Sequence, residues 1–156
     1  MQEIRLHGRG GQGLVKASHI VVRTAVETGH YGQFIPFFGV ERKGSPVFGF
    51  LRLSEEEIRR KTQVYEPDVL IILDDTLVHL PATYAGLKEG GTVVINSVHD
   101  AAALKMPAQA GKVAIVDATG ICMEELGRNI PNTAMLGAFA RVTGLVDKDR
   151  LFDNIA

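Results

Sequence analysis

The sequence predicts an α/β domain of three layers, in which a mostly parallel β-sheet is covered by helices on both faces. A glycine-rich turn from Gly8 to Gly13 separates an alternating segment from a helical pattern. The run from Val69 to Leu73 is continuously apolar, as in a strand buried on both faces of a parallel sheet. Strand-like and helix-like segments alternate along most of the chain, which is the order that builds parallel sheets.

The chain begins with a predicted strand over residues 3–8, and the glycine turn follows it. The next helix is predicted from apolar residues at helical spacing, which are Leu14, Ala17, Val21 and Ala25. Gly29 suits the left-handed position that ends such a helix. These segments predict a strand, a turn and a helix in direct succession.

Two further strands are expected at residues 31–38 and 47–53. The loop between them, 39–46, contains glycines and a proline that prevent a long regular element. Ser54 and the three glutamates after it resemble a helix N-cap with an acidic first turn. This pattern predicts a short polar helix through Thr62.

The second half of the chain continues the alternation. The buried strand at 69–73 ends in Asp74 and Asp75, which we expect to cap a helix reaching about Leu87. Asn132 is a candidate N-cap for one of the later helices. The remaining predicted strands are 92–96 and 112–117, and the remaining predicted helices are 119–126, 133–143 and the segment from 148 onward.

Length and composition indicate one soluble domain over residues 1–156. Apolar residues make up 46% of the chain and charged residues 22%, with a formal net charge of −1. This near-neutral charge disfavours nucleic acid as a partner, because binding its phosphates requires clustered Lys and Arg. Residues 1–66 carry 10 basic and 7 acidic side chains, whereas residues 67–156 carry 7 and 11. The first half is therefore the better candidate for an anion site.

Cys122 is the single cysteine. It excludes an intrachain disulfide, a cysteine-rich zinc site and an iron–sulfur cluster held by this chain alone. We expect it to be a small buried apolar residue and the protein to be cytoplasmic. No apolar run approaches the roughly 20 residues that cross a bilayer, and MQEIRLHG lacks the features of a signal peptide, so neither membrane insertion nor secretion is expected.

The glycine turn has the chemistry of an anion site. Glycines let the backbone approach a ligand, and the free N–H groups and dipole at a helix start favour a pyrophosphate. A dinucleotide site would need a carboxylate at the end of the second strand, but none occurs before Glu41. A nucleoside triphosphate loop would need Lys and Ser or Thr where Leu14 and Val15 stand. A tight turn without any ligand is the alternative.

An aromatic segment from Phe34 to Val40 runs directly into the charged residues 41–44. It can be a core strand with a solvated turn, or part of a subunit interface. In the second case Arg42 and Lys43 would donate to an anion or to a partner's carboxylate. The five histidines show no metal-ligand spacing, and only His7 lies near the glycine turn.

Five motifs of the sequence resemble motifs that occur in the same order in the gamma subunits of the 2-oxoacid:ferredoxin oxidoreductases. The resemblance is greatest to the gamma subunits of the pyruvate enzymes (pyruvate synthases). The five motifs cover nearly the whole chain. The motifs are GRGGQG at 8–13, FGVERKGSPV at 38–47, PDVLIILD at 67–74, GLKEGG at 86–91 and IPNTAMLGA at 130–138.

This resemblance implies a Rossmann-like domain that packs on thiamine diphosphate-binding subunits and helps to hold coenzyme A. Such a complex decarboxylates a 2-oxoacid, passes two electrons through iron–sulfur clusters to ferredoxin and forms an acyl-CoA. The implied partners are alpha-, beta- and delta-type subunits, which would carry thiamine diphosphate, Mg and the clusters. The chain agrees in lacking both a set of cysteines and a Gly-Asp-Gly…Asn-Asn stretch for thiamine diphosphate.

The resemblance also assigns site residues. The pyrophosphate of coenzyme A would lie on the turn, with Arg9 as a further phosphate contact. The loop around Arg42 and Lys43 and the helix start at Asn132 and Thr133 would face the shared site. Family members continue for some tens of residues past the point that matches Ala156, so a C-terminal segment is expected to be missing. The turn residues assigned in this way are Gly10, Gly11, Gln12 and Gly13.

Two alternatives stay open. The same kind of subunit can serve an enzyme for 2-oxoglutarate, branched 2-oxoacids or indolepyruvate, because the pocket for the substrate side chain is expected mainly on other subunits. A chain of this fold can also be a nucleotide-binding or scaffolding module with no part in turnover. In the leading interpretation the isolated chain binds coenzyme A poorly, because its site is composite.

Overall fold

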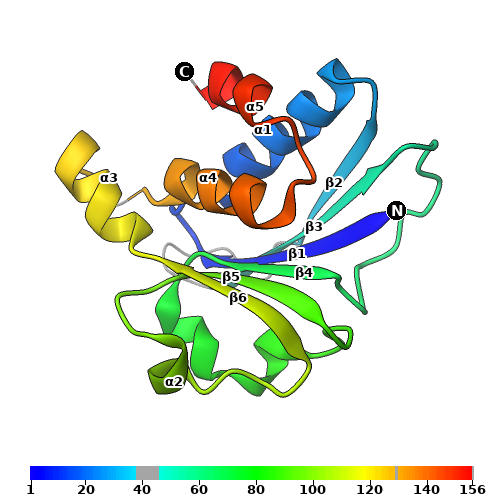
Figure 1. Cartoon of the computed structure of the whole chain (residues 1–156). Helices are drawn as coiled ribbons and strands as arrows, with labels where there is room; N and C mark the ends of the chain where they lie inside the picture. Colours follow the sequence, from blue (N-terminus) through cyan, green and yellow to red (C-terminus); the bar gives the residue numbers. More distant parts are fainter. Residues whose placement is uncertain (38–45, 129, 156) are drawn as a thin grey trace.

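The computed structural model describes residues 1–37, 46–128 and 130–155. Strands and helices alternate along this chain, as the sequence predicts (Figure 1). The strands are β1 (Gln2–Arg9), β2 (Tyr31–Phe37), β3 (Pro46–Ser54), β4 (Val69–Ile72), β5 (Gly91–Asn96) and β6 (Ala110–Val116). The helices are α1 (Leu14–Glu27), α2 (Ala101–Leu104), α3 (Ala118–Leu126), α4 (Asn132–Thr143) and α5 (Lys148–Ile155), with two 3-10 helices, η1 (Asp75–His79) and η2 (Pro81–Tyr84).

The described strands form one sheet in the order β2-β3-β1-β4-β5-β6. β1 pairs in parallel with β4, β4 with β5 and β5 with β6, whereas β3 is antiparallel to both of its neighbours. β3 therefore opposes the direction of the other five, and the expectation of a mostly parallel sheet is confirmed. The carboxyl ends of β1, β4, β5 and β6 meet at one edge of the sheet.

Apolar cores cover both faces of this sheet. Alternate residues of β4 point to opposite sides: Ile71 packs in the core beneath α1, α4 and α5, and Ile72 packs in the core that includes η1. In Figure 1, α1, α4 and α5 lie above the sheet, while α2 and the 3-10 helices lie below it. The alternation explains the unbroken apolar run, because a strand covered on both faces has no polar side.

The helix predicted after Ser54 is wrong. In the described structure residues 55–62 form no helix, and the Ser54 Oγ accepts a hydrogen bond from Glu56 N at 3.0 Å, closing a turn. Arg52 is fully buried and donates through Nη2 to the Gln63 carbonyl at 3.1 Å. A buried guanidinium requires such acceptors, so this tertiary contact fixes the segment in an irregular path that local helix signals do not predict.

Other boundaries differ more modestly. The helix expected through Leu87 is replaced by η1 and η2, which meet at Pro81, a residue without an N–H to continue a helix. Asp74 caps η1 by accepting from Thr76 N, as predicted. β6 begins at Ala110, and α2 lies in the linker before it. Thr28 and Gly29 end α1 as expected, with Gly29 at φ 86°.

Candidate functional site

The glycine turn lies at the carboxyl edge of the sheet, between β1 and β4. The connection from β1 passes through α1 to β2 on one side, and β4 pairs with the other side of β1. Ligands of open α/β sheets bind where the chain diverges in this way. The predicted turn therefore stands at the position where this fold class places its ligands.

Two glycines in the turn have backbone conformations that other residues avoid. Gly11 has φ 92° and Gly13 φ 80°. A Cβ at Gly13 would also overlap the side-chain amide of Asn132. The turn thus needs glycine at both positions, for conformation at Gly11 and for conformation and space at Gly13.

The turn presents a row of backbone donors. Within the described residues, the N–H groups of Gly10, Gly11, Gly13, Leu14 and Val15 have no hydrogen-bond acceptor, and α1 has neither a side-chain cap nor an acidic residue in its first turn. The exposed Gly11 and the half-buried Gly10 and Gly13 are accessible to a ligand. These donors and the dipole of α1 favour a bound anion.

The side chain of Gln12 forms hydrogen bonds within the protein, and its predicted part in phosphate binding stays a prediction. Its Oε1 accepts from the backbone N–H of Arg9 at 2.8 Å, and its Nε2 donates to Asp74 Oδ2 at 2.8 Å. Both ends of the side chain are therefore engaged within the protein. Gln12 therefore holds the turn against the end of β4.

Arg9 lies on the rim of the same crevice. Its Nε and Nη2 are 3.1 and 2.8 Å from Thr76 Oγ1, and its Nε is 3.7 Å from Asp74 Oδ2. Burial raises the pKa of Asp74, but hydrogen bonds from Thr76 and Gln12 and the charge of Arg9 outweigh it and lower the pKa overall. The carboxylate stays ionised, and Arg9 partly offsets its charge beside the turn.

The start of α4 lies against the glycine turn. Asn132 is buried, with 5% exposure; its Nδ2 donates to the Gly13 carbonyl at 3.3 Å and its Oδ1 accepts from Thr133 N at 2.9 Å. Asn132 is the first residue of α4, not its N-cap, so the predicted capping is wrong. The helix starts of α1 and α4 thus meet at the turn, joined by Asn132, while Thr133 is half-buried beside it.

A hollow of about 320 Å³ opens next to the turn at the ends of β4, β5 and β6. Sequence reasoning missed two of its polar residues, Asn96 and Thr119. Asn96 Nδ2 donates to the Leu73 carbonyl at 3.0 Å and to Thr119 Oγ1 at 2.8 Å, which fixes the strand ends. Their positions, at the end of the predicted strand 92–96 and two residues past the predicted strand 112–117, could have indicated them. The hollow is lined by Gln12, Leu73, Asp74, Asp75, Thr76, Asn96, Ser97, Val98, Asp117 and Thr119.

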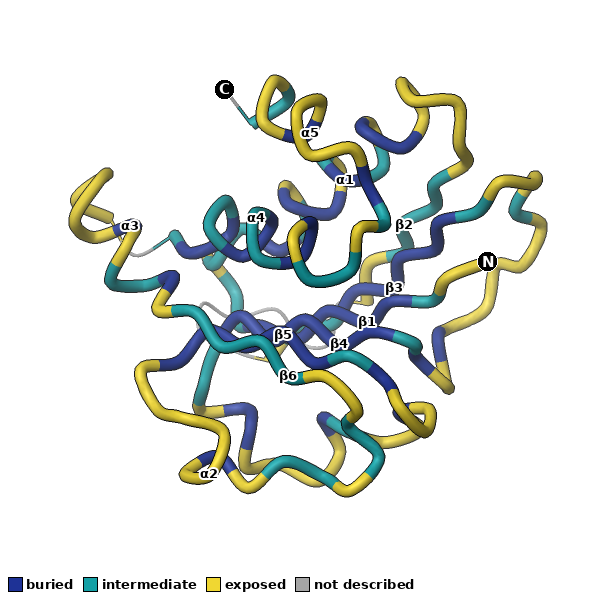
Figure 2. Tube along the Cα trace, viewed as in Figure 1, coloured by how far each residue is buried: buried dark blue, intermediate teal, exposed yellow. Residues whose placement is uncertain are grey.

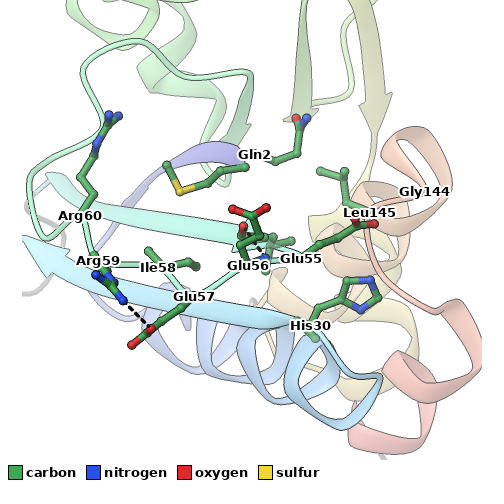
Figure 3. Close-up of a pocket in the computed structure, with 14 residues that line it drawn as sticks. Gln2, His30, Glu55, Glu56, Glu57, Ile58, Arg59, Arg60, Gly144 and Leu145 are labelled. Carbon is green, nitrogen blue, oxygen red and sulfur yellow. Dashed lines mark hydrogen bonds and ion pairs between the residues drawn. The ribbon is translucent and has the colours of Figure 1, made fainter.

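A larger hollow of about 780 Å³ lies away from the turn, and none of the turn residues lines it. Figure 3 shows Glu55, Glu56 and Glu57 around it with His30 and Arg59, and a Glu57–Arg59 ion pair of 3.4 Å. Its glutamates offset the charges of Arg59 and Arg60, and Gly144 in its lining stands at the negative, carboxyl end of α4. This hollow is therefore a weaker candidate for an anion site than the turn, which lies at two positive helix ends.

Several other expectations concern residues away from the turn. Arg42 and Lys43 lie outside the described residues. Cys122 is buried, as predicted, and its Sγ contacts the Thr119 carbonyl at 3.2 Å. The described residues contain no cluster of His, Cys, Asp or Glu that could hold a metal ion, and no helix among them is long and apolar enough to cross a membrane.

The aromatic segment divides between the two faces of the sheet. Phe34 packs in the core under α1, with its ring 5.6 Å from that of His19. Phe37 points to the other face, is 42% exposed and stacks on Phe48 at 6.2 Å. Phe34 is thus a core residue, as the first alternative predicts. A subunit interface on the side of the sheet that carries Phe37 stays a prediction.

The fold and the turn together define a three-layer α/β domain in which the turn after the first strand carries backbone amides without an acceptor among the described residues. The sequence profile of the Pyruvate ferredoxin/flavodoxin oxidoreductase family matches residues 3–156. The chain belongs to this family. The resemblance recognised in the sequence motifs is thereby confirmed.

Similar proteins carry related names. Pyruvate synthase subunit PorC of Methanothermobacter marburgensis is 52% identical over 151 residues, covering 97% of this chain and 82% of its own length. The pyruvate/ketoisovalerate oxidoreductases common subunit gamma of Thermococcus kodakarensis is 51% identical over 148 residues, covering 94% of this chain and 80% of its own length. The crystal structure of pyruvate oxidoreductase subunit PORC from Thermotoga maritima matches with a TM-score of 0.87 and 39% identity, over 99% of this chain and 83% of that one.

Proposed function

We propose that this chain is the gamma subunit of a pyruvate:ferredoxin oxidoreductase and that its glycine turn holds the phosphates of coenzyme A. The observation that carries the proposal is a group of backbone N–H donors at the start of α1 that have no acceptor among the described residues. They belong to Gly10, Gly11, Gly13, Leu14 and Val15. Each charge-assisted hydrogen bond of this kind contributes about 1.5–3 kcal/mol. The reaction implied is oxidative decarboxylation of pyruvate to acetyl-CoA, with electrons passed to ferredoxin.

The surroundings of the turn favour a phosphate over other nucleotide contacts. The start of α4 adds a second positive helix end, and like α1 it has no side-chain cap and no acidic residue in its first turn. β2 carries no carboxylate among Tyr31–Phe37 that could bind the ribose of a dinucleotide. Arg9, and by family resemblance Arg42, Lys43 and Thr133, would add contacts around the same ligand.

The redox chemistry is assigned to other subunits. A single cysteine cannot hold an iron–sulfur cluster. Alpha-, beta- and delta-type partners would carry thiamine diphosphate, Mg and the clusters, and residues 1–156 would act as one domain without activity of their own. We place the assembled enzyme in the cytoplasm, where a thiol such as that of Cys122 stays reduced.

The choice of 2-oxoacid is expected to lie outside this chain. The similar Thermococcus kodakarensis protein is named as a gamma subunit common to pyruvate and ketoisovalerate oxidoreductases. A subunit that serves two substrates does not itself select the substrate side chain. Enzymes for branched 2-oxoacids, 2-oxoglutarate or indolepyruvate are therefore the alternative within the same proposal.

The test compares Gly11→Val with Gly29→Val in the assembled enzyme. Both glycines have positive φ, 92° and 86°, and a Cβ at either would meet no described atom within 4 Å, so the two changes strain the chain alike. Only Gly11 lies where phosphates would approach. We expect Gly11→Val to raise the KM for coenzyme A by about tenfold or more, the equivalent of about 1.4 kcal/mol, while the KM for pyruvate is unchanged.

Gly29→Val should leave both constants near their original values. Equal KM values for coenzyme A in the two variants would refute the phosphate role of the turn. They would instead favour the scaffolding alternative, in which the chain takes no part in turnover.

A further inference from the structure

Helix α3 carries exposed apolar side chains next to the stripe that it buries. Ala118 and Cys122 face the domain and are buried. Ile121, Met123 and Leu126 are 45%, 49% and 60% exposed and lie on both sides of that buried stripe. Large apolar side chains that gather on the solvent side of one short helix indicate a contact surface. In this chain alone most of α3 is exposed to water.

The position of α3 makes this exposure a built feature of the fold. Figure 1 shows α3 standing out from the body of the domain beyond the end of β6, and Figure 2 shows it largely exposed. Its N-terminus is fixed by Asp117, whose Oδ1 accepts from Gly120 N at 2.8 Å, and by Thr119, whose N–H donates to Asn96 Oδ1 at 3.2 Å. The helix is therefore held out by polar contacts at one end.

A further exposed apolar residue lies just past β5, near the start of α3. Val98 is 71% exposed and lines the same hollow as Asp117 and Thr119. The apolar side chains are accompanied by carboxylates, since Glu124 and Glu125 are exposed on α3 and Asp117 is exposed at its start. We call this surface the α3 face; it consists of Val98, Ile121, Met123, Glu124, Glu125 and Leu126.

We propose that the α3 face docks a different subunit of the oxidoreductase, one that presents an apolar patch bordered by Lys or Arg. Exposed apolar residues rimmed by charge are typical of protein contacts. The acidic rim selects a basic partner. A second copy of this chain fits poorly, because a two-fold contact places the same patch against itself and would bring the glutamates of both copies together.

This docking has a consequence for the neighbouring turn. The hollow beside the α3 face includes Gln12 of the glycine turn as well as Asp75 and Asp117. These carboxylates lower the affinity of the region for an anion, and a basic subunit on the α3 face would offset their charge. The docking inference itself rests on the exposed surface and not on coenzyme A binding.

The experiment isolates the complete enzyme through an affinity tag on this chain. Leu126→Lys, which places a cation against the basic partner, and the paired change Glu124→Lys with Glu125→Lys are compared with Val26→Lys. Val26 lies on α1 and is 57% exposed. Its change therefore also replaces an exposed apolar side chain by lysine, but outside the α3 face. We expect at least a tenfold loss of co-purified subunits for the α3 variants, no loss for the control, and unchanged melting of each isolated chain.

Hydrogen exchange gives a second readout without any substitution. The amides of residues 121–128 should exchange at least tenfold more slowly in the assembled enzyme than in the isolated chain. Equal exchange in the two states, or full assembly of the Leu126→Lys enzyme, would overturn the proposal. So would a dimer of the isolated chain that Leu126→Lys dissociates, because the occupant would then be a second copy.

The outcome is separable from that for the glycine turn. Gly11→Val should leave assembly intact and change only the KM for coenzyme A. The α3 variants should lose assembly whether or not the turn binds coenzyme A.

Discussion

Acid should destabilise this protein through His7, a residue buried on β1 with 2% exposure. Arg5 Nε donates to His7 Nε2 at 2.9 Å, and the His7 and Phe48 rings are 5.1 Å apart. Because an arginine can only donate, Nε2 must be the unprotonated nitrogen and the proton resides on Nδ1, which has no partner among the described residues. A second proton would remove the Arg5 bond and place two cations in contact.

Burial, followed by the charge of Arg5, lowers the pKa of His7 from 6.5 to about 3. In the unfolded chain the imidazole takes up its proton near pH 6.5, whereas in the folded chain it stays neutral down to about pH 3. The contribution of His7 to the free energy of unfolding is therefore fully present above pH 6.5. It falls as the pH drops through that value and levels off near pH 3. Between pH 7 and pH 5 the loss from this residue is about 2 kcal/mol.

The assay is urea unfolding of the isolated chain at pH 7, 6 and 5, comparing His7→Gln with the unmodified protein. Glutamine keeps an acceptor for Arg5 and cannot be protonated, so the variant should lose about 2 kcal/mol less than the unmodified chain over this range. His79→Gln, at an exposed position, is the matched control. If the free energy of unfolding of His7→Gln changed with pH as steeply as that of the unmodified protein, the role given to His7 would be refuted. This holds whatever the stability of the variant at pH 7.

Two further predictions concern tertiary contacts. Gly13→Ala should destabilise the chain by about 2–3 kcal/mol in urea unfolding, because the new Cβ overlaps Asn132. The control Gly144→Ala, at φ 64° with no described atom within 4 Å of the new Cβ, should cost only the backbone strain of about 1 kcal/mol. Equal losses in the two variants would show that Asn132 moves aside without cost. Arg52→Ala should lower the free energy of unfolding by about 3 kcal/mol, since it removes one partner of the 3.0 Å ion pair with the largely buried Glu3. A loss below 1 kcal/mol would show that Arg60, which also pairs with Glu3, neutralises that carboxylate by itself.

Local sequence signals predicted most of the fold correctly. The strand at 69–73 needed only its apolar run, because a strand covered on both faces contains little else. The glycine turn needed only its spacing, because positive φ at Gly11 and Gly13 is a property of the backbone. The prediction failed where a tertiary contact determines the local path, as after Ser54, where the buried Arg52 donates to Thr62 Oγ1 and to the Gln63 carbonyl.

The features of the candidate site also separate into those that the sequence predicted and those that only the tertiary structure showed. The sequence alone predicted a glycine turn and a helix start directly after β1, with anion binding as a proposal, since glycine conformation and helix dipoles act over a few residues. Only the tertiary structure decided that Gln12 braces Asp74, that Asn132 is buried against Gly13, and that α3 stands exposed beside the hollow. These facts depend on residues brought together from distant parts of the chain, and side-chain partners at such separations leave no periodic signal in the sequence.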